Sequence, residues 1–170
     1  NTREGSRRNI AAHYDLGNDF FALFLSPDLM YSSAMFASPD EDLETASYRK
    51  LDAVCRKLAL APGDRVIEIG TGWGGFALHA ARHYGAHVTT TTISREQHAL
   101  ASQRVAEADL QDRVTLLLQD YRDLDERFDA AFSLGMFEHV GVKNYPTFFD
   151  VVRRCLPADG LFLLHTIGTN

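Results

Sequence analysis

A glycine-rich turn between an expected strand and an expected helix constrains the fold of this chain most. Residues 65–70 (RVIEIG) form a short apolar run after the turn Pro62-Gly63, and we predict a strand there. Helical spacing of apolar residues begins at about residue 73, within the sequence GTGWGG of residues 70–75. Glycine lets the backbone turn tightly and approach a ligand without a Cβ clash. A strand that leads through such a turn into a helix is typical of an α/β nucleotide-binding unit.

From about residue 63 onward, expected strands alternate with expected helices. This alternation predicts an α/β fold with a doubly wound, mostly parallel sheet, which binds ligands beyond the carboxyl ends of its strands. Ser94 is expected to be the N-cap of one helix, with Gln97 completing a capping box. The further expected strands are residues 87–92, 114–119, 128–134 and 161–166, and the expected helices are residues 73–84, 94–108 and 145–155.

Residues 1–60 have a different pattern. Helices are expected at residues 18–25 and 42–60, joined by a segment with two prolines and several serines. The second helix has one apolar face, which predicts packing on the sheet. The aromatic residues before it form either a lid over a ligand or a covering layer, and composition favours neither. We therefore expect one domain over residues 1–170, with a helical cover at 1–60 and a nucleotide-binding core at 61–170.

Composition excludes several classes of function. The chain has 45% apolar and 24% charged residues, as soluble globular proteins do, and no apolar run approaches the length of a membrane span. A net charge of −6 without a dense Lys/Arg block argues against a broad nucleic-acid surface. The basic cluster Arg3, Arg7 and Arg8 is interpreted as a solvated arm in preference to a contact with anionic lipid headgroups.

Cysteine and histidine usage gives no indication of a disulfide or of a metal site. Cys55 and Cys155 lie far apart in helix-like segments, which suits reduced, packed thiols in a cytoplasmic protein. The seven histidines show no spacing typical of metal ligands. Because the chain begins without Met, we expect it to be a piece of a longer protein.

The residues after the glycine turn argue against NAD as its ligand. Positions 70, 72 and 75 satisfy G-x-G-x-x-G, but a dinucleotide site needs an acidic residue at the tip of the second strand. Here that tip is Thr90-Thr91-Thr92, and the next acid is Glu96, inside a helix. An oxidoreductase is therefore disfavoured, while a tight packing turn without any ligand stays an alternative.

Acidic residues at two strand ends suit a different nucleotide. Glu68 precedes the first glycine, where the turn can accommodate an amino-acid tail and ribose, and its carboxylate can bind backbone amides or a ligand ammonium group. Asp120 and Tyr121 end the third expected strand, where a carboxylate can accept from an adenine amine and an aromatic ring can stack on the base. Both carboxylates are also compatible with structural roles at a helix terminus or in a loop.

Several separate motifs in order resemble the cyclopropane-fatty-acyl-phospholipid synthases and the mycolic acid cyclopropane synthases. The resemblance extends over nearly the whole chain, and its number of motifs makes it far more specific than the glycine turn alone. It implies a Rossmann-like class I methyltransferase fold. Its markers are HYDLGNDFF (13–21), MYSSAMF (30–36), VIEIGTGWGG (66–75), TISREQ (92–97), QDYRDL (119–124), GMFEHVG (135–141) and LPADGLFLLHTIG (156–168).

The resemblance implies that the cofactor is S-adenosylmethionine, and it assigns residues to each part of this methyl donor. Gly135 lies under the sulfonium. The other residues are Tyr31 and Ser32 from the N-terminal cover, Gly70, Gly72 and Trp73 at the methionine end, Thr92 and Gln97 at the ribose, and Asp120, Tyr121 and Arg122 around the adenine.

The resemblance also implies a catalytic pocket for bicarbonate, formed by Glu138, His165 and the residue at position 33. Ring closure requires a base that removes a proton from the newly added methyl group, and bound bicarbonate is suited to that role. Taken without the resemblance, Glu138 is compatible with a capping role and His165 with a core position.

Aromatic residues are expected to stabilise the intermediate of this reaction. Methyl transfer to an alkene leaves a carbocation on the lipid chain, and the face of an aromatic ring attracts a cation. The sequence does not decide which ring is involved; the candidates are Tyr14, Phe20 and Phe137.

Two residues depart from the family pattern. Ser33 stands where the family usually has Cys in Y-S-C-A, and Thr71 replaces Cys between the glycines. If position 33 contributes a backbone amide, serine can substitute; if the thiol matters, ring closure is in doubt. The family also continues beyond His165 with strands, helices and a tyrosine of the bicarbonate site. We therefore expect the chain ending at Asn170 to lack C-terminal strands and to be an incomplete catalyst.

The expected function is transfer of a methylene group from S-adenosylmethionine to a cis double bond of a phospholipid acyl chain. The alternative is a C- or N-methyltransferase of the same family that closes no ring. A non-catalytic module that binds the donor or a lipid surface is a third class. The expected partners are unsaturated phospholipid acyl chains, contacted by a cytoplasmic protein at the periphery of the inner membrane; oligomeric state is not predicted.

Overall fold

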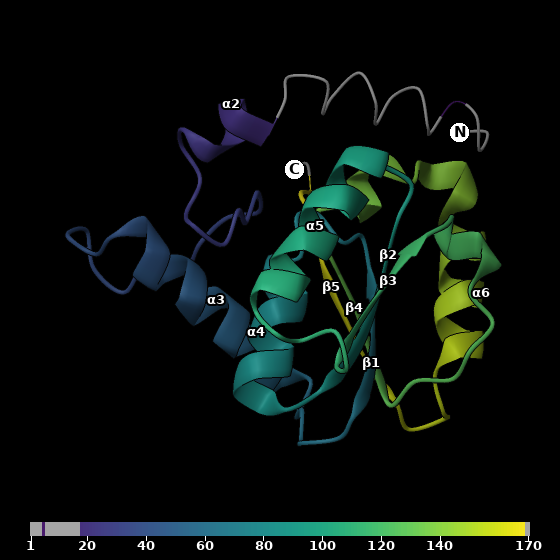
Figure 1. Cartoon of the computed structure of the whole chain (residues 1–170). Helices are drawn as coiled ribbons and strands as arrows, with labels where there is room; N and C mark the ends of the chain where they lie inside the picture. The colour runs from purple at the N-terminus through teal and green to yellow at the C-terminus, as the bar shows by residue number, and fades with distance from the viewer. Residues whose placement is uncertain (1–4, 6–17, 169–170) are drawn as a thin grey trace.

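Five short strands form one parallel sheet at the centre of the computed structural model, which describes residue 5 and residues 18–168 (Figure 1). The strand order is β3-β2-β1-β4-β5, and every neighbouring pair is parallel. This arrangement confirms the predicted doubly wound sheet. The strands are β1 (Arg65–Ile69), β2 (His87–Thr92), β3 (Val114–Leu118), β4 (Ala130–Leu134) and β5 (Leu161–His165).

Helices cover both faces of this sheet. In Figure 1, α4 and α5 lie on one side and α6 on the other, while α3 lies outside α4. The helices are α2 (Asn18–Ala22), α3 (Leu43–Lys57), α4 (Gly75–Tyr84), α5 (Arg95–Glu107) and α6 (Tyr145–Cys155), with the 3-10 helices η1 (Tyr121–Asp123), η2 (Phe137–His139) and η3 (Val142–Asn144). None of the helices in the described ranges is long and apolar enough to span a bilayer.

The two N-terminal helices are shorter than the sequence pattern predicts. The helix expected at 18–25 covers five residues, and the one expected at 42–60 covers fifteen. Helix α3 ends with Leu58 as its C-cap, and the following residue, Ala59, adopts a positive φ of 52°. Such a left-handed conformation stops helical hydrogen bonding.

The expected N-cap of α5 is confirmed, but the capping box is wrong. Ser94 Oγ accepts a hydrogen bond from the Gln97 amide at 3.2 Å. The Gln97 side chain accepts from Thr92 Oγ1 at 2.8 Å, and Thr92 Oγ1 in turn accepts from the Ser94 amide at 3.1 Å. Thr92, the last residue of β2, therefore binds the Ser94 amide, which the Gln97 side chain would bind in a capping box.

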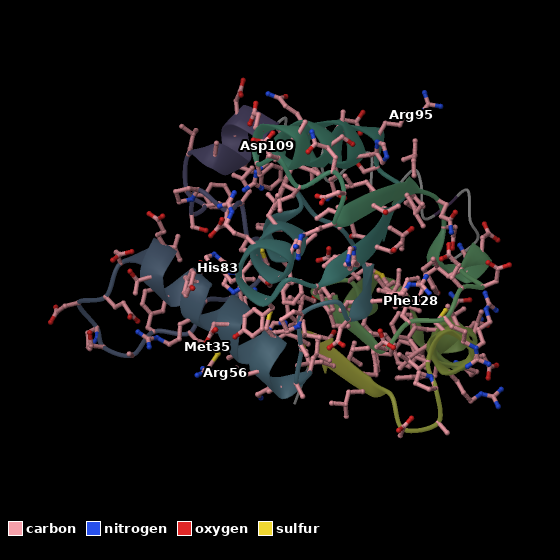
Figure 2. All side chains as sticks on the ribbon, turned by 60° about the horizontal axis from the view of Figure 1, so that its bottom comes forward. Met35, Arg56, His83, Arg95, Asp109 and Phe128 are labelled. Carbon is pink, nitrogen blue, oxygen red and sulfur yellow. The ribbon has the colours of Figure 1, made fainter. Side chains whose placement is uncertain are left out.

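Apolar side chains fill both interfaces between the sheet and the helices. On the α4 side, Phe76 and Phe132 lie 3.9 Å apart between ring centroids. On the α6 side, Phe148 is fully buried in a cluster that includes Phe128, which Figure 2 labels. Because both faces of the sheet are covered, its inner strands β1, β2 and β4 are buried almost throughout, although β2 consists mostly of threonine.

Helix α3 packs next to α4 on the same side of the sheet. Leu51 and Val54 belong to the same buried cluster as Phe76 of α4. In the first half of α3, the ring of Tyr48 lies 5.4 Å from that of His83 near the end of α4, which Figure 2 labels. The cover helix thus packs on α4 and shares a buried cluster with the strands, as its apolar face predicts.

The two cysteines lie in different parts of the core. Cys55 belongs to the cluster on the α4 side and Cys155, the last residue of α6, to the cluster on the other side; both thiols are free. Burial raises the pKa of the Cys55 thiol to about 12, and it also raises the pKa of Cys155. Burial therefore favours the protonated form of both thiols, and the prediction that the two cysteines are packed far apart is confirmed.

A core substitution tests this packing. Phe132→Ala removes a ring that is 0% exposed at the centre of the sheet, and we expect it to lower the free energy of unfolding by about 3–5 kcal/mol. Leu161→Ala, at an exposed position of β5, is the control and should cost less than about 1 kcal/mol. Chemical denaturation followed by circular dichroism measures both; equal losses would contradict the assignment of the core.

Candidate functional site

The turns that follow β1 and β4 lie side by side at the carboxyl edge of the sheet. Gly70 has a φ of +110° and Gly135 a φ of +66°. A Cβ on Gly70 would lie 3.1 Å from the Cβ of Met136, so the two turns are in contact. Because β1 and β4 are neighbours in the sheet but not in sequence, this is the switch point at which such sheets bind ligands.

The glycines of the first turn serve two different purposes. Gly72 has a φ of +52°, and a Cβ there would meet nothing within 4 Å, so open space lies in front of it. A Cβ on Gly75 would instead lie 2.4 Å from the carbonyl oxygen of Asp28 and 2.8 Å from Met30 Sδ. The third glycine of the G-x-G-x-x-G pattern therefore admits the N-terminal cover, while the second faces open space.

Arg104 of α5 holds the same part of the cover against the turn. Its Nη1 donates to the carbonyl oxygens of Trp73 at 2.7 Å and Asp28 at 3.1 Å, and its Nη2 donates to that of Pro27 at 3.2 Å. Burial lowers the pKa of Arg104. One guanidinium group, with its several donors in a fixed geometry, thus joins segments that are distant in sequence.

Glu68 is a buried carboxyl group within β1, at 3% exposure. Burial raises its pKa to about 8, and a hydrogen bond with Thr90 and the charge of Lys50 oppose that rise. Thr90 Oγ1 also hydrogen-bonds with Thr71 Oγ1 at 2.8 Å. Within the described part of the chain, Glu68 Oε2 has no hydrogen-bond partner. The carboxyl group therefore retains capacity to accept a hydrogen bond.

The ends of β2 and β3 hold the residues expected at the ribose and the adenine. Thr92 and Gln97, the residues expected at the ribose, are joined by the hydrogen bond from Thr92 Oγ1 to the Gln97 side chain. Asp120 accepts from Arg122 Nε at 2.8 Å and from Nη2 at 2.6 Å, and it caps η1 through the Arg122 amide. The ring of Tyr121 packs on that of Phe148, with 5.4 Å between centroids. The structure brings each expected pair together and gives each a structural role as well.

The N-terminal cover brings its aromatic residues onto the glycine turn. The ring of Trp73 lies 4.9 Å from that of Phe21 and 6.4 Å from that of Tyr31. The next residue, Ser32, accepts a hydrogen bond from a lysine of α3. A Cβ on Gly135 would lie 3.7 Å from the Ser32 Cβ. The cover therefore reaches both turns at the switch point.

Glu138 and His165 lie close to the second turn. The Gly135 amide donates to the carbonyl oxygen of His165 at 3.0 Å, and a Cβ on Gly135 would lie 3.9 Å from Glu138 Oε1. Thr166 Oγ1 donates to Glu138 Oε2 at 2.9 Å. His165 Nδ1 is buried without a partner among the described residues. The structure thus brings two of the three residues expected at the bicarbonate pocket to one turn.

The two residues that depart from the family pattern lie in different surroundings. Ser33 is exposed, and it is the adjacent Ser32 whose side chain lies against Gly135. Thr71 is buried at 3% exposure and bonded to Thr90. The substitution at position 71 is thus accommodated by a hydrogen bond within the protein, whereas the side chain at position 33 lies at the surface.

The aromatic rings expected beside a carbocation differ in their exposure. Phe137 stacks on Tyr145 with 4.2 Å between centroids, inside the core on the α6 side, and Phe20 is exposed on α2. Tyr14 lies outside the described residues, as does the basic cluster Arg3, Arg7 and Arg8. Over residue 5 and residues 18–168, no group of three His, Cys, Asp or Glu side chains is arranged to hold a metal ion.

Sequence reasoning missed Lys50, Arg104 and Thr166. For Lys50 a signal exists: it lies four residues after Ala46 and four before Val54, on the apolar face of α3. A lysine at that position indicates a buried partner. Arg104 and Thr166 carry no comparable signal, because their partners are backbone carbonyls or a side chain distant in sequence.

Gly75→Ala tests the contact between the cover and the turn. The new Cβ would overlap the Asp28 carbonyl, so we expect the free energy of unfolding to fall by about 1–3 kcal/mol. Trp73 is the one tryptophan of the sequence, so displacement of Phe21 should also shift its fluorescence. Gly168→Ala, in open space, is the control. Unchanged stability and emission for Gly75→Ala would contradict the contact.

The raised pKa of Glu68 makes stability depend on pH. A carboxyl group whose pKa rises from 4.5 to about 8 contributes stability that is complete below 4.5 and is lost as pH rises through 8. Between about pH 5 and pH 8, the wild-type protein should therefore lose about 2–4 kcal/mol relative to Glu68→Gln. Denaturation across this range measures the difference, with Glu107→Gln as an exposed control. Parallel curves for wild type and Glu68→Gln would refute the prediction.

Comparisons with known proteins agree with this geometry. The family model described as mycolic acid cyclopropane synthetase matches residues 1–170. The cyclopropane-fatty-acyl-phospholipid synthase of Escherichia coli (strain K12) is 52% identical over 157 residues, which are 92% of this chain and 40% of that protein. A probable fatty acid methyltransferase of Pseudomonas putida is 45% identical over 160 residues, 93% of this chain and 41% of that protein.

A solved structure also superposes closely. A mycolic acid cyclopropane synthase complexed with SAH (S-adenosylhomocysteine) and CTAB has a TM-score of 0.88 and 39% identity, covering 93% of this chain and 55% of that one. The sheet and its helices are thus those of the Rossmann-like class I methyltransferases. The chain spans about two fifths of the length of the two curated relatives. By its sequence and its fold, the chain belongs to the mycolic acid cyclopropane synthetase family.

Proposed function

We propose that the protein transfers a methylene group from S-adenosylmethionine to a cis double bond of a phospholipid acyl chain. The observation that carries this proposal is the contact between the two turns at the switch point. It places the open space at Gly72 on one side and Glu138 with His165 on the other. The name of the Escherichia coli relative, a cyclopropane-fatty-acyl-phospholipid synthase, supports the same reaction.

The residues around the first turn fit the methyl donor. Gly72 leaves room for its methionine end, and the unpartnered Oε2 of buried Glu68 can accept a hydrogen bond from its ammonium group. The donor, when bound, supplies an electrophilic methyl group. In this proposal Thr92 and Gln97 contact the ribose, Asp120, Tyr121 and Arg122 surround the adenine, and Tyr31, Ser32, Gly70, Trp73 and Gly135 complete the pocket.

The second turn fits an anion that serves as a base. His165 Nδ1 is buried and available to donate a hydrogen bond. Thr166 holds the Glu138 carboxylate, which then orients the anion or accepts its proton. Bicarbonate, when bound, would supply the basic oxygen that ring closure requires.

The bonds of the reaction balance without an oxidant. The alkene attacks the methyl carbon, so a C–C bond forms as the donor's C–S bond breaks, leaving a carbocation on the acyl chain. Loss of a proton from the new methyl group releases the electron pair that closes the ring. In this proposal the bound acyl chain itself has to exclude water, which would otherwise capture the carbocation.

We further propose that the protein works at the cytoplasmic periphery of the inner membrane. Helix α2 and the two residues after it expose Phe20, Leu23 and Phe24, and Leu23 is 82% exposed. Exposed apolar residues on one segment suit contact with an acyl-chain boundary. The free buried thiols Cys55 and Cys155 suit a reducing compartment.

A methyltransferase that closes no ring is the second candidate. Ser33 is exposed and lacks the thiol that the family usually has at that position, and the Pseudomonas putida relative is named a probable fatty acid methyltransferase. Both candidates share donor binding and the first bond-forming step. They differ in whether the proton loss closes a ring or leaves an alkene.

Expression of the full-length protein in cells that lack cyclopropane lipids tests the proposal. We expect acyl chains that are one CH2 heavier and resist ozonolysis, measured by mass spectrometry. Glu138→Gln should reduce their formation by about 10²–10⁴-fold, while exposed Glu107→Gln should not. Heavier chains that ozone still cleaves would favour methyl transfer alone, and an unchanged lipid profile would refute both candidates.

A further inference from the structure

A buried lysine on the cover helix faces the donor side of the site. Lys50 of α3 is 3% exposed, and its Nζ donates to Ser32 Oγ at 2.6 Å. Glu68 of β1, also 3% exposed, attracts the Lys50 ammonium group electrostatically. Burying an ammonium group is costly unless it is hydrogen-bonded, and Ser32 supplies that bond.

Lys50 and its two neighbours, Ser32 and Glu68, connect three segments that are distant in sequence. Lys50 belongs to the cover helix, Ser32 to the segment before it, and Glu68 to the strand that leads into the glycine turn. Ser32 in turn lies against Gly135 in the second turn. The backbone of the same segment is also anchored to α3, because the Met35 amide donates to the Ala46 carbonyl oxygen at 3.1 Å. Lys50 thus lies where the cover meets both turns.

The charge of Lys50 also acts on Glu68 directly. Burial favours the neutral form of the carboxyl group, and the Lys50 ammonium group opposes this by lowering the pKa of Glu68. Without Lys50, the carboxyl group would hold its proton more tightly. A neutral Glu68 attracts a cationic ligand group less strongly than a carboxylate does.

We propose that Lys50 is a positioning residue of the donor site, which holds Ser32 against the second turn through the hydrogen bond from its buried ammonium group. This inference rests on the proposed function, because it requires that the methyl donor binds at the first turn. It differs from a purely structural role, in which Lys50 would stabilise the fold without affecting donor affinity.

Titration of the full-length protein with S-adenosylhomocysteine by calorimetry tests this inference. Lys50→Met should weaken binding by about 10- to 100-fold, the effect of losing one charged hydrogen bond. Lys50→Arg retains the charge and should bind more tightly than Lys50→Met. Lys57→Met, at an exposed position of the same helix, is the matched control and should bind as the wild type does.

A double-mutant cycle identifies the route through Ser32. Because Lys50 acts through that hydroxyl group, Lys50→Met combined with Ser32→Ala should bind about as well as Ser32→Ala alone. In the active enzyme, Lys50→Met should raise the KM for the donor more than it lowers kcat. Both readouts separate positioning from a loss of stability, which denaturation measures in parallel.

Three results would overturn the inference. They are wild-type affinity in a folded Lys50→Met variant, multiplicative losses in the double mutant, and equal binding by the Met and Arg variants. Absence of binding by the wild-type protein would instead refute donor binding itself, and with it the proposed function.

Discussion

Parallel pairing of β1 with both β2 and β4 is the constraint on which the rest of the structure depends. From β1 the chain continues to β2 on one side, and from β4 it continues to β5 on the other side of the sheet. The turns after β1 and β4 therefore meet without a helix between them. Gly70 and Gly135 adopt positive φ there, and a Cβ on Gly70 would make a tight 3.1 Å contact with the Met136 Cβ of the other turn. The space for a ligand follows from the strand order.

The N-terminal cover is held to this edge mainly through backbone atoms. Arg104 binds three carbonyl oxygens, and Gly75 admits one of them without a side chain in between. Such contacts specify the path of the cover while leaving its side chains available for other contacts. Trp73, Phe21 and Tyr31 pack together over the first turn in this way. The cover is therefore part of the candidate site.

The sheet and the helices on it could be predicted because their patterns are local. Apolar runs, the N-cap of α5 and the glycine turn each depend on neighbours within a few residues. The capping box was wrong because Thr92, on the preceding strand, competes for Gln97. Lys50 and Arg104 were missed because their partners are 18 to 77 residues away. The resemblance to a family supplied residues such as His165, whose position in an apolar strand otherwise indicates a core histidine.

Buried polar groups divide into two kinds at this edge. Thr90 and Thr71 are paired within the protein, which offsets the cost of their burial. Glu68 Oε2 and His165 Nδ1 are buried without partners among the described residues, one beside each turn. An unsatisfied buried group costs about 1–3 kcal/mol. In the proposed function this cost is offset on donor and anion binding, because each ligand would complete the hydrogen bonding of one of these two atoms.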